Sequence, residues 1–400
     1  MAELTLTMRV KLSLPEQDKT RLTALCSAYA SCCNDVSAWI GDHHTLSQKA
    51  INKAVYHPMR DRYGLLAQIT QSAIRRVIAS YKTIHTRLDH DKASRKRRHG
   101  KARHYFDIRP VYRASGIDLL WNRDYSYSHR TGMFSLPVMD GRIKAKAVWK
   151  GIPDTVREGR FGTARLECRD GSWFLLTPST IPVPDPSPTP STIVGVDLGI
   201  RMLTTSYDGD NTVFQRGGEV KTIRGRYKTL RARLQKRGTR SARKHLKAIG
   251  RRENRWMTDI NHQVSKALVD RYGPDTMFVL ENLSGIRNAT ERVRIKDRYT
   301  QVSWAFSQLR RMIEYKAQRN GQTVVAVDPR YTSQTCPKCG LVLKQNRDKR
   351  LHLYACRNCG YRSNDDRVAA MNLRHKGYDL LMAQYAAGMP DGVGVQSTTP

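Results

Sequence analysis

The sequence has 400 residues, of which 39% are hydrophobic, a size and composition that exclude wholesale disorder and allow two or three domains. Its 70 Lys and Arg against 35 Asp and Glu give a formal net charge of +35, far more than solubility needs, so a polyanionic partner is expected. The N-terminus lacks the apolar core of a signal peptide, and no apolar run reaches a bilayer-spanning length. We therefore expect a cytoplasmic protein without a membrane partner.

The first part of the chain is expected to combine a β-structure with an inserted helical region. The alternation of Thr5–Leu14 predicts a strand, whereas residues 16–91 follow helical spacing. Residues 105–177 change to short β-like segments, which predict a small barrel or sheet that the first strand could complete. Residues 1–15 and 92–180 are therefore assigned to a β-domain around the helical region.

Three stretches of extreme composition lie outside these elements. The run SRKRRHGKAR within 92–104 is too charged to fold by itself and is expected to be a phosphate-binding loop that includes Arg97 and Arg98. Residues 181–192, IPVPDPSPTPST, predict an extended linker that lies in no helix or central strand, and thus a domain boundary. Residues 381–400 are predicted to be a disordered tail.

Two apolar segments that each carry an acid follow the linker. In TIVGVDLGI, Asp197 stands near the end of a β-branched run, and Gly199 permits a tight hairpin. For one such motif, a turn or capping Asp is the simpler explanation. Glu281 follows four apolar residues in MFVLE, however, and an acid drawn into a core needs a cation to face. The second acid therefore strengthens the interpretation of the first.

A third acid is expected in DDRVAAMNL, where Asp365 or Asp366 could also serve as a helix cap or first-turn charge. Clustered carboxylates repel one another, so a fold that gathers them normally pairs them with Mg²⁺. Two such ions roughly 3.5–4 Å apart would activate water on one side of a phosphodiester and stabilise the leaving oxygen on the other. This arrangement predicts hydrolysis of a nucleic-acid backbone.

Four cysteines predict a structural zinc site. Cys336-Pro-Lys-Cys339-Gly and Cys356-Arg-Asn-Cys359-Gly are separated by sixteen residues, the spacing of a four-thiolate site with two knuckles. A redox pair would explain one motif and leave the other idle. Four protein ligands leave no open position, so this zinc should not perform the hydrolysis. The other cysteines are expected to be reduced and structural: Cys26, Cys32, Cys33 and Cys168.

Together, these motifs resemble the TnpB proteins of bacterial and archaeal insertion sequences, relatives of the type V CRISPR effectors. GVDLGI resembles their first RuvC motif, FVLENL the second, and the cysteine region with DDRVAAMNL resembles their zinc ribbon and third motif. The start VKLSLPEQ and LLAQITQSAIRRVIASYK resemble the wedge strand and recognition helices. The resemblance implies an α/β multidomain protein: a wedge β-barrel, a helical recognition domain at 16–91, an RNase H-like RuvC domain at 193–335 and 361–380, and a zinc ribbon at 336–360.

The resemblance also assigns the catalytic residues. Asp197, Glu281 and Asp366 would hold two Mg²⁺ ions, and Asp366 is chosen over Asp365 because the third family motif reads D-x-N-A-A. Val368 stands where that motif has Asn, a departure that leaves weakened or altered activity open.

The implied function is cleavage of DNA, directed by a guide RNA, beside a short transposon-adjacent motif. Guide RNA, target DNA and their heteroduplex would be the partners of a monomeric, nucleoid-associated protein, which fits the excess charge because such duplexes are held through phosphates. Gln71 matches a family position that contacts the adjacent motif, and Arg75 lies on the same helix. The basic stretch 224–255, charged all round its helix, is expected to contact guide RNA or the heteroduplex through Arg231, Lys236, Arg237, Arg240 and Lys244.

Other functions stay open. A miniature type V CRISPR effector would differ in its guide, and a guide-dependent DNA-binding repressor would bind without cleaving. A DDE-type transposase would use similar carboxylates, although the ribbon before the third acid fits RuvC order better. An RNA-binding zinc-ribbon protein would leave the acid-bearing strands unexplained. Gly285–Thr300 is expected to be either a lid over the acids or a passive loop.

Overall fold

The computed structural model describes residues 1–95, 104–282 and 306–388. They form two compact units: Thr5–Pro182, and Val183 onward together with Met1–Leu4. The boundary lies within the proline-rich stretch, but strand β8 (Ser172–Val183) includes its first three residues, and β8 is a central strand. The predicted linker therefore starts too early, because Ile181 and Val183 continue the buried alternation of β8. No helix in the described ranges is long and apolar enough to cross a membrane.

The helical region of the first unit consists of α1 (Glu16–His43), α2 (Gln48–Tyr63) and α3 (Ala67–Arg95). The side chains that define the helical spacing of α1 are buried, as expected: Leu22, Leu25, Tyr29, Cys33 and Val36. Helix α3 extends to Arg95, so residues 92–95 do not belong to a loop, and this short stretch has no Gly or Pro to end a helix. The rest of the predicted basic loop, with Arg97 and Arg98, lies outside the described residues.

Eight strands form the sheet of the first unit, in the order β2-β7-β8-β1-β5-β4-β3, with β6 paired to β8. The first strand of the chain therefore completes the sheet, as predicted, by lying between β8 and β5. A pairing of β2 with β3, which would close a barrel, is not among the pairs of the described strands, so the wedge barrel stays a prediction. Besides β8, the strands are β1 (Ala2–Ser13), β2 (Gly116–Leu119), β3 (Ser126–Ser128), β4 (Met133–Val138), β5 (Gly141–Val148), β6 (Arg160–Phe161) and β7 (Ala164–Arg169). The remaining elements of this unit are η1 (Tyr105–Asp107) and α4 (Asp154–Arg157).

The second unit is built on a mixed five-stranded sheet in the order β11-β10-β9-β12-β13. Strands β9, β12 and β13 are parallel, and β10 and β11 run antiparallel beside them. Strand β9 turns into β10 through the predicted hairpin. Gly199 allows it because a Cβ there would meet the carbonyl oxygen of Met202. The strands are β9 (Thr192–Asp197), β10 (Met202–Tyr207), β11 (Thr212–Arg216), β12 (Thr276–Glu281) and β13 (Thr323–Val327).

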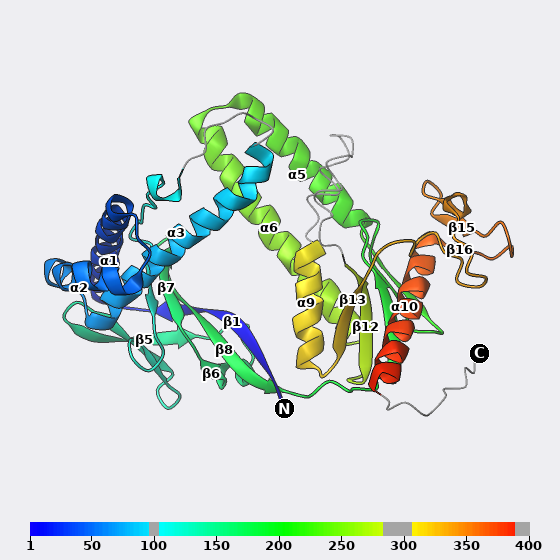
Figure 1. The fold of residues 1–400 in the computed structure, drawn as a ribbon, viewed down its shortest axis with the longest axis horizontal. Helices are drawn as coiled ribbons and strands as arrows, with labels where there is room; N and C mark the ends of the chain where they lie inside the picture. The colour runs from blue at the N-terminus through cyan, green and yellow to red at the C-terminus, as the bar shows by residue number, and fades with distance from the viewer. Residues whose placement is uncertain (96–103, 283–305, 389–400) are drawn as a thin grey trace. The chain divides into compact units, whose positions relative to one another are not determined.

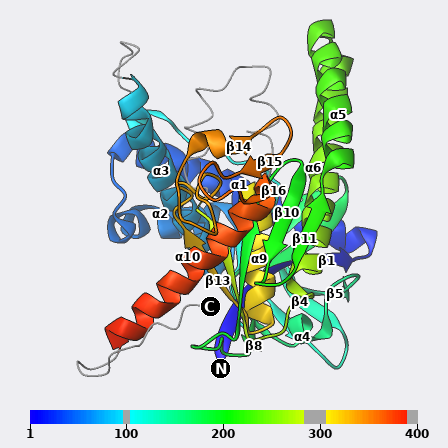
Figure 2. The same ribbon diagram turned by 90° about the vertical axis from the view of Figure 1, so that its right-hand side faces the viewer.

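Helices cover both faces of this sheet (Figures 1 and 2). On one face, Val194 and Phe278 pack against α6 (Arg240–Val269) and α9 (Phe306–Arg319). On the other, neighbouring side chains such as Ile193 pack against α10 (Asp365–Gly388). The strands are therefore buried on both sides, which explains their nearly continuous apolar sequences.

Helix α10 packs so closely on β9 that their backbones are in contact at Gly195. A Cβ built on Gly195 would overlap the carbonyl oxygen of Ala370 and crowd the amide of Arg374, so this position accepts only glycine. Helix α10 reaches Gly388, and Leu381 is buried against the sheet. Residues 381–388 are therefore helical rather than part of a disordered tail, and residues 389–400 lie outside the described chain.

The most basic stretch forms two helices, not one. Helix α5 (Gly218–Arg237) ends at Gly238 with φ 64°, and the Thr239 side chain accepts a hydrogen bond from the Ala242 amide to begin α6. The charge does not go all round these helices, because Leu234 of α5 and Ala242 of α6 are buried.

Candidate functional site: three acids beside a cysteine cluster

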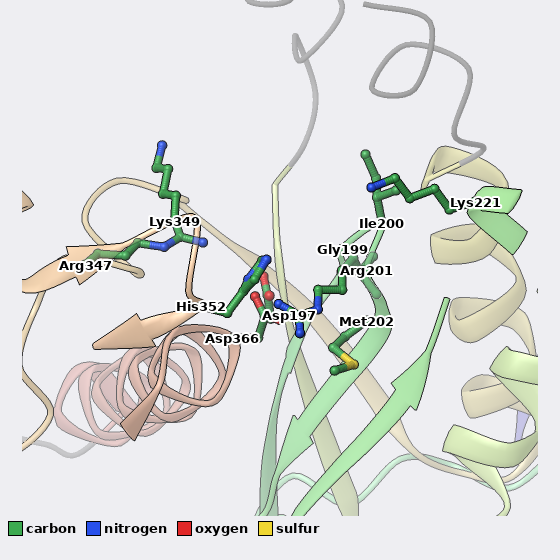
Figure 3. Close-up of a pocket in the computed structure, with 11 residues that line it drawn as sticks. Asp197, Gly199, Ile200, Arg201, Met202, Lys221, Arg347, Lys349, His352 and Asp366 are labelled. Atoms are coloured by element: carbon green, nitrogen blue, oxygen red, sulfur yellow. The ribbon is translucent and has the colours of Figure 1, made fainter. Parts of the chain in front are cut away.

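Two acids stand at the carboxyl ends of adjacent parallel strands. Val196 of β9 is paired with Leu280 of β12, so the next residues, Asp197 and Glu281, lie side by side at the same edge of the sheet. The first turn of α10 brings Asp366 to this edge, where it lines one cavity with Asp197 (Figure 3). Acids that are far apart in sequence are thus gathered by strand register and by helix packing.

Burial and mutual repulsion oppose ionisation of these acids. Burial raises the pKa of Asp197 well above its ordinary value, and the charges of Glu281 and Asp366 raise it further. Burial also raises the pKa of Glu281, although the Thr332 hydroxyl, which donates to its Oε1 at 2.6 Å, acts in the opposite direction. The pKa of Asp366 is raised by burial and by its neighbour Asp365. Such a cluster has the charge and the oxygen donors to hold divalent cations.

The cavity has a volume of about 610 Å³ and a basic lining. The β9–β10 hairpin contributes Arg201, the start of α5 contributes Lys221, and the ribbon contributes Arg347 and Lys349 (Figure 3). Cations around a carboxylate cluster create a place where a phosphodiester could be held against bound metal ions. The position of Arg347 and Lys349 beside the acids follows from the packing of the ribbon and not from any sequence motif.

Asp365 and Asp366 have different surroundings. The N-cap of α10 is Asn364, whose side chain accepts from the amides of Asp366 and Arg367 at 3.0 and 3.2 Å. Asp365, fully buried, instead accepts from Arg347 Nε at 2.8 Å and lies 3.3 Å from His352 Nδ1. The capping role considered for either Asp thus belongs to Asn364, and Asp366 is the one that lines the cavity.

Val368 and Asn372 join α10 to the cysteine region. Val368, fully buried, packs with Cys336, Tyr354 and Cys356, so an apolar side chain suits this position. The Asn372 amide donates to the carbonyl oxygens of Thr332 and Thr335 at 2.7 and 2.9 Å, which holds the segment that enters the ribbon.

The four cysteines form one cluster in a ribbon of three short strands, β14 (Arg347–Asp348), β15 (Leu353–Ala355) and β16 (Arg362–Asn364). The Sγ atoms of Cys336 and Cys359 are 3.6 Å apart, as are those of Cys339 and Cys356. Four thiolates at ~2.3 Å from one zinc ion would be about 3.8 Å apart. Both knuckles turn at a left-handed glycine, Gly340 and Gly360, so the predicted ligand set is assembled in zinc-like geometry.

The other cysteines do not reach this cluster. All four are free, three of them are buried and Cys168 is half-buried, as expected of reduced structural thiols. Burial raises the pKa of Cys26 and of Cys32 to about 12, which disfavours their reactive thiolate forms.

The predicted nucleic-acid contacts have different environments. Gln71 is half-buried and Arg75 exposed on α3, while Lys236, Arg237, Arg240 and Lys244 are exposed around the tip of the α5–α6 hairpin. Arg231 instead pairs with Glu253 at 2.8 Å, and Arg224 lies 3.7 Å from the same carboxylate. Glu253 of α6 thus provides a negative charge for two cations of α5, a pairing that the sequence does not show because the partners lie on different helices. The segment Gly285–Thr300, expected to be either a lid or a passive loop, lies outside the described residues.

Two family models and several known proteins match parts of this chain. A family model described as "Probable transposase" matches residues 177–284, and one described as "Cas12f1-like, TNB domain" matches residues 306–373. A TnpB-like protein of Methanocaldococcus jannaschii is 31% identical over 198 residues, 47% of this chain and 70% of the relative. The putative RNA-guided DNA endonuclease InsQ of Escherichia coli is 28% identical over 232 residues, 53% of this chain and 55% of the relative.

A CRISPR-associated endodeoxyribonuclease Cas12f1 of Syntrophomonas palmitatica is 30% identical over 223 residues, 51% of this chain and 42% of the relative. The chain thus spans less than half the length of this relative. Among solved structures, the chain resembles Cas12f1 in its complex with sgRNA and target DNA, with a TM-score of 0.60 at 12% identity, over 93% of this chain and 99% of that one. This similarity is one of fold only, and it covers almost the whole chain.

Proposed function

Because this chain belongs to the family of TnpB-like proteins, we propose that it is an RNA-guided DNA endonuclease whose catalytic acids are Asp197, Glu281 and Asp366. The observation that carries the proposal is the convergence of the three acids beside a cavity with a basic lining. A scaffold that only binds nucleic acid gains nothing from three mutually repelling carboxylates, which cost folding free energy. Their place at the ends of β9 and β12 and the start of α10 supports an RNase H-like RuvC domain.

The acids suit Mg²⁺ because they offer oxygen ligands, and because burial and nearby carboxylates raise the pKa values of Asp197 and Asp366, so a bound cation would relieve this cost. When bound, such ions lower the pKa of water and neutralise charge that develops on a phosphodiester. The chain's own residues do the positioning. Thr332 orients Glu281 through its 2.6 Å hydrogen bond, and Arg201, Lys221 and Lys349 would hold the phosphates of the cut strand.

We assign zinc a structural role in the ribbon, since its four thiolates would leave no open coordination position. Guide RNA and the RNA–DNA heteroduplex would be held through phosphates by the exposed cations of the α5–α6 hairpin and of α3. Gln71 is proposed to read the motif beside the target, through the bidentate contact that a Gln amide makes with adenine.

A cleavage assay tests the proposal. The purified complex of protein and copurified RNA is incubated with Mg²⁺ and supercoiled plasmids that carry the matching target beside a randomised motif. We expect linear product, which Asp197→Ala abolishes while binding of RNA and target persists. Asp259→Ala, at an exposed acid on α6, is the matched control and should cleave normally. Stable target binding by the wild type without any strand break would favour a repressor instead.

The copurified RNA separates the remaining candidates. Sequencing should return RNA that derives from the end of an insertion sequence. Repeat-derived CRISPR RNA would identify a miniature type V effector, and strand transfer without any RNA would point to a transposase.

A further inference from the structure

We propose that His352 supplies a nitrogen ligand to the metal bound at Asp366, so that this centre favours Mn²⁺ over Mg²⁺ more than three carboxylates alone would. The inference rests on the proposed carboxylate centre and adds to it a residue from the ribbon. Neither the acid motifs nor the cysteine spacing points to this histidine.

The position of His352 carries the inference. One potential ligand atom each from His352, Asp365 and Asp366 lie within 4.8 Å of one another, so the imidazole is close enough to Asp366 for both to bind one ion. His352 also lines the same cavity as Asp197 and Asp366, and Figure 3 shows its ring beside the Asp366 carboxylate. The imidazole is therefore within the centre, on the side formed by the ribbon.

The ring is held in a manner typical of metal-binding histidines. Its Nδ1 lies 3.3 Å from Oδ1 of Asp365, and Arg347 fixes the other oxygen of that carboxylate at 2.8 Å. A carboxylate that binds one imidazole nitrogen sets the tautomer and leaves the second nitrogen as a ligand. Asp365, which is fully buried, would then orient His352 rather than bind the metal.

The backbone of His352 is also fixed at the start of α10. It adopts a left-handed conformation with φ 56°, and its carbonyl accepts from the Asp365 amide and from Asn364 Nδ2, each at 3.3 Å. Asn or Gly would fit such a turn at least as well. The ring lies outside the apolar core of the ribbon and remains 26% exposed. Neither the turn nor packing therefore explains why the side chain is an imidazole.

Ligand chemistry gives the consequence. Mg²⁺ prefers oxygen ligands and near-octahedral hydration, whereas imidazole nitrogen binds transition metals better. A nitrogen in the shell should strengthen Mn²⁺ binding relative to Mg²⁺, and it should be visible directly in the spectrum of the bound ion.

The test uses the zinc-loaded full chain, freed of RNA, with Mn²⁺ as the probe in pulsed electron paramagnetic resonance. We expect a ¹⁴N coupling from directly bound imidazole, which changes to ¹⁵N when only the histidines carry ¹⁵N. His352→Asn, which can keep the left-handed turn, should remove the coupling and weaken Mn²⁺ binding about tenfold. Mg²⁺ affinity should change less than Mn²⁺ affinity. The zinc content of the variant is measured to check that the ribbon is intact. His375→Asn, at an exposed histidine on α10, is the control and should change neither.

The outcomes separate this inference from the proposed function. If Mn²⁺ binding depends on Asp197 but the wild type shows no histidine nitrogen coupling, the role of His352 is wrong and the carboxylate centre stands. If Asp197→Ala leaves Mn²⁺ affinity unchanged, the carboxylate centre itself is wrong. The ¹⁵N-histidine experiment on the wild type decides the question even where His352→Asn loses its zinc.

Discussion

The cysteines and the acids lie in the same unit, yet the chain gathers them by different means. The cysteines occupy two similar turns separated by sixteen residues, each closed by its own glycine. The acids come from two strands and a helix, and they meet because β9 and β12 are in register and α10 packs on β9. A local site of this kind needs its metal to fold, whereas the acid centre needs a complete hydrophobic core that can bear the repulsion.

Removing one zinc ligand should have the largest effect. Cys336→Ser is expected to reduce bound zinc from ~1 per chain to almost none, because the site loses one of its four thiolate ligands. Binding of a structural zinc ion supplies about 10–16 kcal/mol of free energy to the folding of such a domain, so the ribbon should unfold without it. Zinc content by mass spectrometry and proteolysis of the ribbon measure the result. Cys168→Ser should leave zinc unchanged, and a fully zinc-loaded Cys336→Ser variant would contradict the assigned ligand set.

A methyl group at Gly195 should come next. Gly195→Ala forces the β9 backbone away from α10 and is expected to lower the free energy of unfolding by about 3 kcal/mol or more, in denaturant titration. Gly225→Ala within α5, where a Cβ meets no atom within 4 Å, should instead be neutral or stabilising by up to about 1 kcal/mol. Equal effects of the two substitutions would show that the close approach is not required.

Val368→Asn tests the contact between the start of α10, which carries Asp366, and the cysteine ribbon. Although it restores the residue of the family motif, it places an amide among Cys336, Tyr354 and Cys356, which should cost about 1–3 kcal/mol and speed zinc release to a chelator. Val342→Asn, at an exposed ribbon position, should change neither quantity. Faster DNA cleavage by Val368→Asn at unchanged stability would mean that Val368 weakens the wild-type enzyme.

Asp197→Asn should have the smallest effect on stability, and unlike the preceding substitutions it should stabilise the fold. The folded-state pKa of Asp197 is raised above its unfolded value, so its ionisation destabilises the fold as pH rises from about 4. In buffer free of Mg²⁺ and Mn²⁺, the variant should therefore unfold at pH 7 roughly 2–4 °C above the wild type, with no gain at pH 3.5. Calorimetry across this pH range measures it, and a lower midpoint at pH 7 would show that other charges already compensate Asp197.

The same contrast explains what the sequence could predict. The cysteine cluster follows from spacing alone, and the β9 and β12 acids follow from apolar strands that carry one charge each. Glu253 under Arg231 and His352 beside Asp366 were missed because their partners lie on other elements, and no periodic pattern marks them. The extension of α3 to Arg95 and of α10 to Gly388 was missed because composition, not helix stop signals, set those boundaries.

The contact between Gly195 and α10 has a consequence for exchange with solvent. Asp197 stands two residues beyond that contact on β9, and Asp366 four residues before Ala370 on α10. The contact involves backbone atoms, so no rotamer change can relax it. Amide protons of Val196 and Arg374 should then exchange with deuterium only on unfolding of the whole unit. The separation of the two acids would accordingly persist while surface loops open and close around them.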